Sequence, residues 1–236
     1  EQDEKIHTVM PMPENEETWQ NLQIIFATKN GNIRRNQLSD FTNIRQNGKI
    51  AMKLNENDEL VSVIPCSDTD NVLLATRLGK AIRFDVNDVR VFVGRGSSGV
   101  RGIKLKPNDY VVSMSLISKM EKRYILSVTE NGFGKRTPIE DYRMTNRGGQ
   151  GVANIECSTR NGPVVASYVA SEDDQIMLVT NSGKLIRIRV HGGEGADLRV
   201  GVGDRDHDGA HHQLFHAGRD AHPTGAARAA ARGRDP

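Results

Sequence analysis

Short apolar runs recur along the chain at a nearly constant interval, and each is followed by the motif Thr-x-x-Gly-x-x-x-Arg. The runs begin at Ile24, Val72, Tyr124 and Ile176. The motif glycines are Gly31, Gly79, Gly132 and Gly183, at intervals of 48, 53 and 51 residues. A period of this length is typical of propeller blades or solenoid units. The pattern therefore predicts one repetitive architecture.

Each repeat predicts four β-strands. The apolar run, the glycine turn and a second run indicate a β-hairpin, with positive φ expected at the glycine. In the first three units a polar, basic connection leads to a third strand, at 48–54, 99–105 and 151–155, and then to a fourth, at 60–63, 110–114 and 163–167. We therefore predict an all-β, propeller-like repeat of four-stranded blades that form an incomplete ring.

Polar linkers and a change of composition divide the chain. The predicted parts are the end of a preceding blade with its linker (1–19), three blades (20–66, 67–118 and 119–171), a partial blade (172–190) and an atypical tail (191–236). The tail lacks Lys, Ile, Ser, Asn, Met and Tyr, yet it holds six of the seven histidines. We expect it to be disordered, and a reading-frame change near codon 191 is our hypothesis for its origin.

Composition narrows the class of protein only slightly. The 236 residues carry a formal charge of +2, but residues 72–112 hold eight Lys and Arg against three acidic residues. Cys66 and Cys157 are isolated, so we expect neither a disulfide nor a zinc site, and a reducing cytoplasm fits. The cluster at 206–212 has metal-ligand residue types, but nothing around it would fix their geometry, and no metal site is predicted. We expect no membrane span and no signal peptide.

Five motifs, taken in order, carry a family resemblance. They are Ala27–Gly31, Asn57–Leu60, Gly99–Leu105, Glu130–Thr137 and Gln175–Met177. Together they resemble the C-terminal domain of the A subunit of bacterial DNA gyrase, over residues 1 to about 190. The resemblance implies a six-bladed β-pinwheel whose basic rim wraps double-stranded DNA. It also implies an ATP-dependent type IIA topoisomerase that introduces negative supercoils.

The same resemblance implies partners and cofactors that belong to other parts of the enzyme. The gyrase B subunit is one expected partner and a second copy of the gyrase A subunit is the other, both through upstream domains. ATP and Mg are expected on other domains or subunits. Cytoplasmic, nucleoid-associated localisation is expected, with no membrane partner.

Two departures from the family limit what is carried over. The gyrase box of the first blade is missing, because the chain is expected to begin at the end of the second blade, although 147–151 resembles that box. The catalytic domain upstream is missing too, so no catalytic residue is predicted. In particular, we expect no catalytic role for Tyr110, Tyr124, Tyr142 or Tyr168.

Basic residues in and beside the connections are the candidate DNA contacts. Nearby glycines let the backbone approach a phosphate and offer its N–H groups. The candidates are Arg45, Lys49, Arg90, Arg95, Arg101, Lys104, Arg143 and Arg147, with Arg34, Lys80 and Lys135. Solvated loops are the alternative. The motif arginines Arg35, Arg83 and Arg136 have two open interpretations, a phosphate contact or an ion pair with Asp40, Asp88 and Asp141 respectively.

Several functions stay open at this point. The C-terminal domain of the topoisomerase IV A subunit has the same blades, and repeat folds also serve as protein interaction platforms. Aromatic residues make up 5% of the chain, too few for a platform that stacks single-stranded bases. No constellation of catalytic residues recurs at a plausible spacing, so we expect no enzymatic activity from this chain alone.

Overall fold

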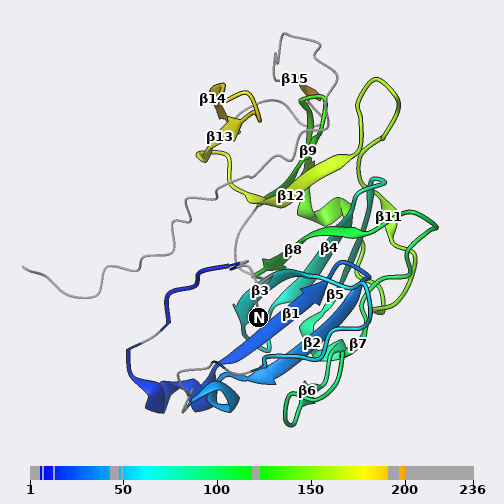
Figure 1. Ribbon diagram of the computed structural model, residues 1–236. Coiled ribbons are helices and arrows are strands. Elements are labelled where there is room, and N and C mark those ends of the chain that lie inside the picture. The colour runs from blue at the N-terminus through cyan, green and yellow to red at the C-terminus, as the bar shows by residue number, and fades with distance from the viewer. Residues whose placement is uncertain are drawn as a thin grey trace, which may run out of the picture.

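The computed structural model describes residues 6, 8–12, 14–42, 48, 50–118 and 123–190, and the backbone of 197–199. Over these residues the fold is all-β, as predicted, with four short 3-10 helices (Figure 1). The helices are η1 (Glu16–Asn21), η2 (Leu38–Phe41), η3 (Val86–Asp88) and η4 (Ile139–Asp141). The strands are β1 (Gln23–Thr28), β2 (Asn32–Gln37), β3 (Leu60–Cys66), β4 (Asn71–Thr76), β5 (Lys80–Asp85), β6 (Val91–Phe92), β7 (Val100–Arg101), β8 (Val111–Ile117), β9 (Tyr124–Thr129), β10 (Phe133–Pro138), β11 (Val152–Ala153), β12 (Val164–Ala170), β13 (Gln175–Val179), β14 (Leu185–Arg189) and β15 (Asp197–Arg199).

Each predicted hairpin is present, and each turns at its motif glycine. The hairpins are β1–β2, β4–β5, β9–β10 and β13–β14. The four glycines have φ between +77° and +81°, where an L side chain is strained. In the first three units, the connection is followed by one more long strand, which is β3, β8 or β12. This strand pairs with the first strand of the hairpin in the same unit. The predicted fourth strands are therefore confirmed.

The predicted third strands do not join their own units. β7, from the second unit, pairs with β2 of the first unit, and β11, from the third unit, pairs with β5 of the second. In the tail, β15 pairs with β10 at the corresponding edge. Among the described residues of 48–54, no strand is present. The sheets therefore exchange strands, and four strands of one unit do not form one blade.

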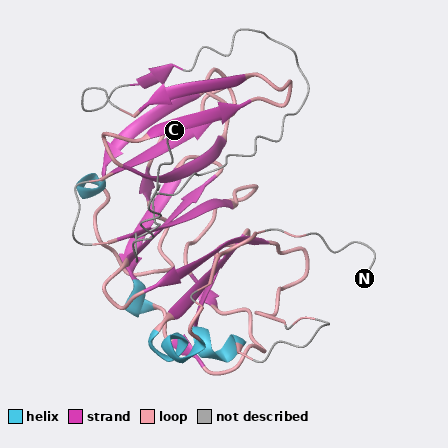
Figure 2. Cartoon of the chain, turned by 90° about the vertical axis from the view of Figure 1, so that its left-hand side faces the viewer, coloured by secondary structure: helices cyan, strands magenta, loops and turns pink. Residues whose placement is uncertain are grey.

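The sheets stack on one another through buried apolar faces. Alternate residues of β4 point to opposite sides: Val72 and Leu74 pack toward the first sheet, whereas Leu73 and Ala75 pack toward the third. Every residue of β4 is buried, as expected for a strand covered on both faces. Figure 2 shows the successive sheets lying one above another. A third cluster joins the third sheet to the β13–β14 hairpin.

The two ends of each sheet differ. β3 packs against β8, and β8 packs against β12, so these strands gather on the inner side of the stack. The exchanged strands β7 and β11 lie at the opposite end of the sheet order, together with β6. We call this opposite edge, with the connections that lead into it, the rim. The described part of the chain holds no helix long and apolar enough to cross a membrane.

Candidate nucleic-acid interface

The rim is built from two steps of the same design. The first rim step, residues 90–101, runs along β2: Val91 pairs in parallel with Arg35, and Val100 pairs antiparallel with Ile33. The second rim step, residues 143–153, runs along β5: Met144 bridges Arg83 in parallel, and Val152 pairs with Ala81. Each step therefore lays a glycine-rich connection over the edge of the preceding unit.

A glycine makes each close approach possible. A Cβ on Gly99 would lie 2.3 Å from the carbonyl oxygen of Ile33, and one on Gly151 would lie 2.3 Å from that of Ala81. Both glycines also have positive φ, +84° and +69°. Since a heavy atom does not fit at that distance, the exchanged strands require glycine at these two positions.

Backbone hydrogen bonds join the two steps into one surface. The amide of Gly102 donates to the carbonyl of Gly31 in the first unit over 2.8 Å. The amide of Lys104 donates to Gly149 over 2.8 Å, and the amide of Gly148 donates to Gly102 over 2.6 Å. Residues 101–104 consequently lie between the turn of one unit and the connection of another.

Most of the candidate cations that the structure describes are accessible. Arg90, Arg101, Lys104 and Arg143 are exposed, and Arg95, Arg147, Lys80 and Lys135 are half-buried. Their local contacts vary, and four of these side chains have described partners. The Arg90 guanidinium lies 4.3 Å from the Phe92 ring centre. Arg95 donates to the Ile50 carbonyl over 2.9 Å, and Lys135 donates to the Asn154 carbonyl over 3.3 Å. Arg147 donates to the carbonyls of Asp88 and Arg101 over 2.8 and 3.1 Å. Arg45 and Lys49 lie outside the described residues.

Arg34 differs from the other candidates because its side chain is inside the protein. The residue is 1% exposed, and its guanidinium donates to the carbonyls of Gly94 and Ser97. Burial lowers the pKa of this guanidinium, and the Asp40 carboxylate opposes that effect. The group is therefore enclosed by the first rim step and is not presented to a phosphate.

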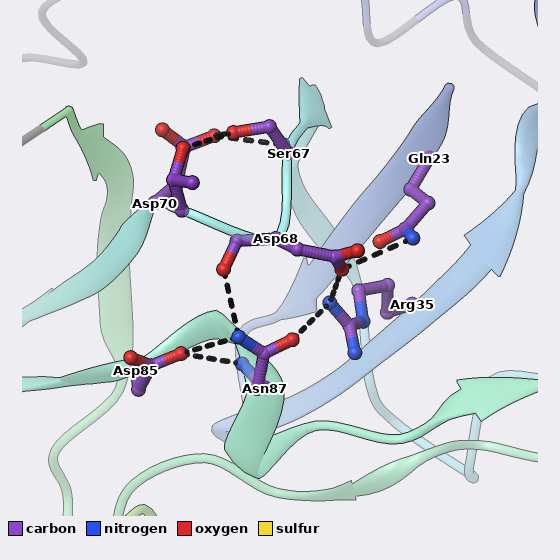
Figure 3. A network of polar contacts seen from close by, with 8 residues as sticks. Gln23, Arg35, Ser67, Asp68, Asp70, Asp85 and Asn87 are labelled. Atoms are coloured by element: carbon purple, nitrogen blue, oxygen red, sulfur yellow. Dashed lines mark hydrogen bonds and ion pairs between the residues drawn. The ribbon is translucent and has the colours of Figure 1, made fainter. Parts of the chain in front are cut away.

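The motif arginines are structural, but their partners are not the predicted aspartates. Arg35, 5% exposed in its side chain, pairs with Asp68 of the following linker over 3.0 Å (Figure 3). Asn87 also accepts from Arg35, and Gln23 also donates to Asp68. This network connects the first hairpin, the linker and η3.

The other two motif arginines also contact groups within the protein. Arg83 donates to the Asn71 side chain over 2.8 Å and to the Ile139 carbonyl over 2.9 Å. Arg136 lies 3.7 Å from the carboxylate of Glu172, in the linker that follows the third unit, and 4.1 Å from the Tyr124 ring centre. The ion-pair interpretation therefore fits Arg35 and Arg136, with acidic residues from the following linkers, whereas the described partners of Arg83 are neutral groups.

Two tyrosines of the third unit, Tyr142 and Tyr168, have buried hydroxyl groups. Burial raises the pKa of Tyr142 to about 12, and its hydroxyl donates to Asn154 over 2.5 Å. Burial likewise raises the pKa of Tyr168. Both phenols therefore stay protonated near neutral pH, and neither is an accessible nucleophile.

Sequence reasoning missed the residues that fix the first rim step. Asn36 is fully buried and donates to the carbonyls of Phe92 and Gly94 over 3.1 and 2.9 Å. Ser97 accepts from Arg34 through its hydroxyl over 2.9 Å. The sequence held one signal of this role for Arg34. The equivalent residues of the second and fourth units are Ile82 and Ile186, which indicates that the side chain at this position faces the interior.

Known proteins share the sequence pattern that builds this rim. The family model for the DNA gyrase C-terminal domain, a β-propeller, matches residues 23–67, 70–118, 123–162 and 174–192. The A subunit of DNA gyrase from Rickettsia bellii is 41% identical over 80% of the chain, and the chain spans only 26% of that relative.

Solved structures give the same picture. A structure of the DNA gyrase A C-terminal domain has a TM-score of 0.67 and 31% identity, covering 77% of this chain and 61% of the other. A structure of the C-terminal domain of DNA topoisomerase IV has a TM-score of 0.68 and 26% identity, covering 75% and 58% respectively. The fold of the repeat therefore matches C-terminal domains of both enzymes.

Proposed function

The chain belongs to the family of DNA gyrase C-terminal domains, and we propose that its rim binds and wraps double-stranded DNA as part of a gyrase A subunit. The supporting observation is that exposed cations follow one another across the joined rim steps. Arg90 and Arg101 belong to the first step, Lys104 follows at the junction, and Arg143 begins the second. A duplex laid along this edge meets positive charge in each unit that it crosses.

Phosphate contacts account for the binding. The exposed cations are three arginines and one lysine, and Gly96 and Gly149 are exposed in the same connections, where the lack of a side chain lets the DNA backbone approach. No described base-reading element, such as a long helix on the rim, accompanies them. Recognition is accordingly independent of base sequence, apart from a preference for flexible DNA that bends at low energy.

Salt dependence tests this proposal. Four exposed cations that each neutralise one phosphate give a slope of about −4 in a plot of log affinity against log salt. Linear duplex affinity measured by fluorescence anisotropy is expected to fall about 100-fold between 50 and 200 mM salt. Affinity that is flat with salt would contradict phosphate binding and favour a protein interaction platform.

Wrapping is tested separately from binding. A nicked circular plasmid sealed by ligase in the presence of the chain is expected to yield topoisomers shifted in one direction, because a wrap of fixed hand traps linking difference. An unshifted distribution with normal duplex affinity would leave binding in place and reject wrapping by this chain.

The rest of the assignment concerns the longer protein. We propose association with the gyrase B subunit, together with a second copy of the gyrase A subunit, through upstream domains. ATP and Mg bind to other domains or subunits of that longer protein. The protein is cytoplasmic and associated with the nucleoid. The C-terminal domain of the topoisomerase IV A subunit is the second candidate, supported by the structural similarity above.

A further inference from the structure

Arg34 occupies a position where the repeat otherwise favours an apolar or partly exposed side chain. It lies three residues after the motif glycine, where the second unit has Ile82, the third Lys135 and the fourth Ile186. Ile82 is 1% exposed, and so is Arg34. The repeat therefore forms its hairpin without a buried charge at this position, and the hairpin alone does not explain Arg34.

The bonds of the Arg34 guanidinium lead to one segment of the rim. It donates to the Gly94 carbonyl, to the Ser97 carbonyl and to the Ser97 hydroxyl. Its Nε donates over 2.7 Å to Asn36, which itself donates to the Gly94 carbonyl. The guanidinium carbon lies 4.9 Å from the Phe92 ring centre. Arg34 therefore contacts both ends of the loop 94–97.

This loop carries one candidate phosphate contact and adjoins another. Arg95 lies between the two residues that Arg34 holds, and Arg101 follows on β7. Gly94 and Gly99 have positive φ, so the loop turns sharply on both sides of Arg95. Glycine-rich backbone has many conformations when free, and fixing it before binding removes an entropic cost from the binding step.

We propose that Arg34 is a positioning residue of the DNA interface, which rests on the function proposed above. Its fork-shaped set of donors fixes the carbonyls of Gly94 and Ser97, and this presents Arg95 and the loop amides to the DNA backbone. Arg34 itself does not touch DNA. A lysine at this position offers a single nitrogen and does not reproduce the fork.

The repeat supplies the substitution that tests this role. Arg34→Ile installs the residue of the second and fourth units and removes the donor to Asn36, Gly94 and Ser97. Because these acceptors lose their partner, we expect thermal stability to fall, and duplex affinity at 100 mM salt to fall about 10-fold. A loss of structure alone would lower affinity whether or not Arg95 is present, which the double-mutant cycle below tests.

Two further variants separate the explanations. Arg34→Lys keeps the charge and is expected to bind as weakly as Arg34→Ile. Wild-type affinity in Arg34→Lys would mean that only the charge matters and would overturn the proposal. Ser97→Ala removes one acceptor at the exposed loop, where folding is not at risk, and is expected to lower affinity about 2-fold to 3-fold.

A double-mutant cycle provides the sharpest test. In an Arg95→Ala background, Arg34→Ile is expected to lower duplex affinity less than about 3-fold, because the main cation that it positions is gone. Fully additive losses would reject positioning through Arg95. If the wild-type chain itself shows no salt-dependent duplex binding, the proposed function fails; if it binds and the cycle is additive, only the role of Arg34 fails.

Discussion

The two rim steps have the same backbone path but are held by different chemistry. In the first, buried Arg34 and Asn36 donate from β2 to the carbonyls of the connection. In the second, the β5 residue equivalent to Arg34 is apolar: Cδ1 of Ile82 lies 3.6 Å from where a Cβ on Gly149 would sit. There, Arg147 of the connection reaches back to the Asp88 carbonyl. Strand exchange therefore depends on the backbone and its glycines, which the two steps share, while the side chains that fix each connection differ.

The largest effect is expected where the steps are alike. Gly99→Ala and Gly151→Ala each place a Cβ within 2.3 Å of a carbonyl oxygen, at positive φ. Each is expected to lower the free energy of unfolding by at least about 2 kcal/mol. Urea denaturation measures this, with Gly96→Ala as the control, because nothing lies within 4 Å of its Cβ. If only one of the two substitutions lowered the free energy of unfolding by this amount, the two steps would not be equivalent.

Charge reversal of the first step is expected to have the next largest effect. Arg95 and Arg101 are accessible to a phosphate, so Arg95→Glu with Arg101→Glu replaces two attractions by two repulsions. We expect duplex affinity to fall about 100-fold at 100 mM salt, with an unchanged circular dichroism spectrum. Arg143→Glu in the second step is expected to lower affinity about 10-fold. Unchanged binding in the double variant would remove the first step from the interface.

A smaller effect is expected from the arginine that fixes the second step. Arg147→Gln removes donors to the carbonyls of Asp88 and Arg101. We expect stability to fall by about 1 kcal/mol and affinity to fall about 3-fold. Arg34→Ile removes a buried donor with more partners and is expected to lower both properties further than Arg147→Gln does. A larger stability loss in Arg147→Gln than in Arg34→Ile would contradict the greater role given to the buried arginine.

The smallest effect is expected away from the rim, in the linker network of Figure 3. Asp68 pairs with Arg35, but its side chain is 67% exposed. Because solvent screens such a pair, Asp68→Ala is expected to lower stability by at most about 1 kcal/mol and to leave duplex affinity unchanged. Thermal unfolding and anisotropy measure the two properties. A clear loss of affinity would extend the interface to the linker.

The repeat made much of this fold predictable. The hairpins and their positive-φ glycines follow from local pattern, and both appear where expected. Strand exchange was not predictable, because the apolar pattern of 99–105 says that a strand forms but not which sheet it joins. The partner is chosen by long-range contacts such as that between Gly102 and Gly31.

The site was predictable only in outline. Arg101 and Lys104, two of the cations expected near glycines, are exposed at the rim, and their contact with DNA stays a prediction. The surface position expected for Arg34 is wrong, because residue type indicates a charge but not its burial. Of the two interpretations left open for Arg35, the structure supports an ion pair, but the partner is Asp68 from a distant linker and not Asp40, five residues away.

The central claim is that exposed rim cations bind duplex phosphates. The most direct test compares the salt slope of duplex affinity for the wild-type chain with that of a variant in which Arg90, Arg101, Lys104 and Arg143 are each replaced by glutamine. These side chains are exposed on both rim steps and at their junction. The slope is predicted to become shallower by about 4, which leaves the contribution of Arg95, with thermal stability preserved. An unchanged slope in the folded variant would contradict the account.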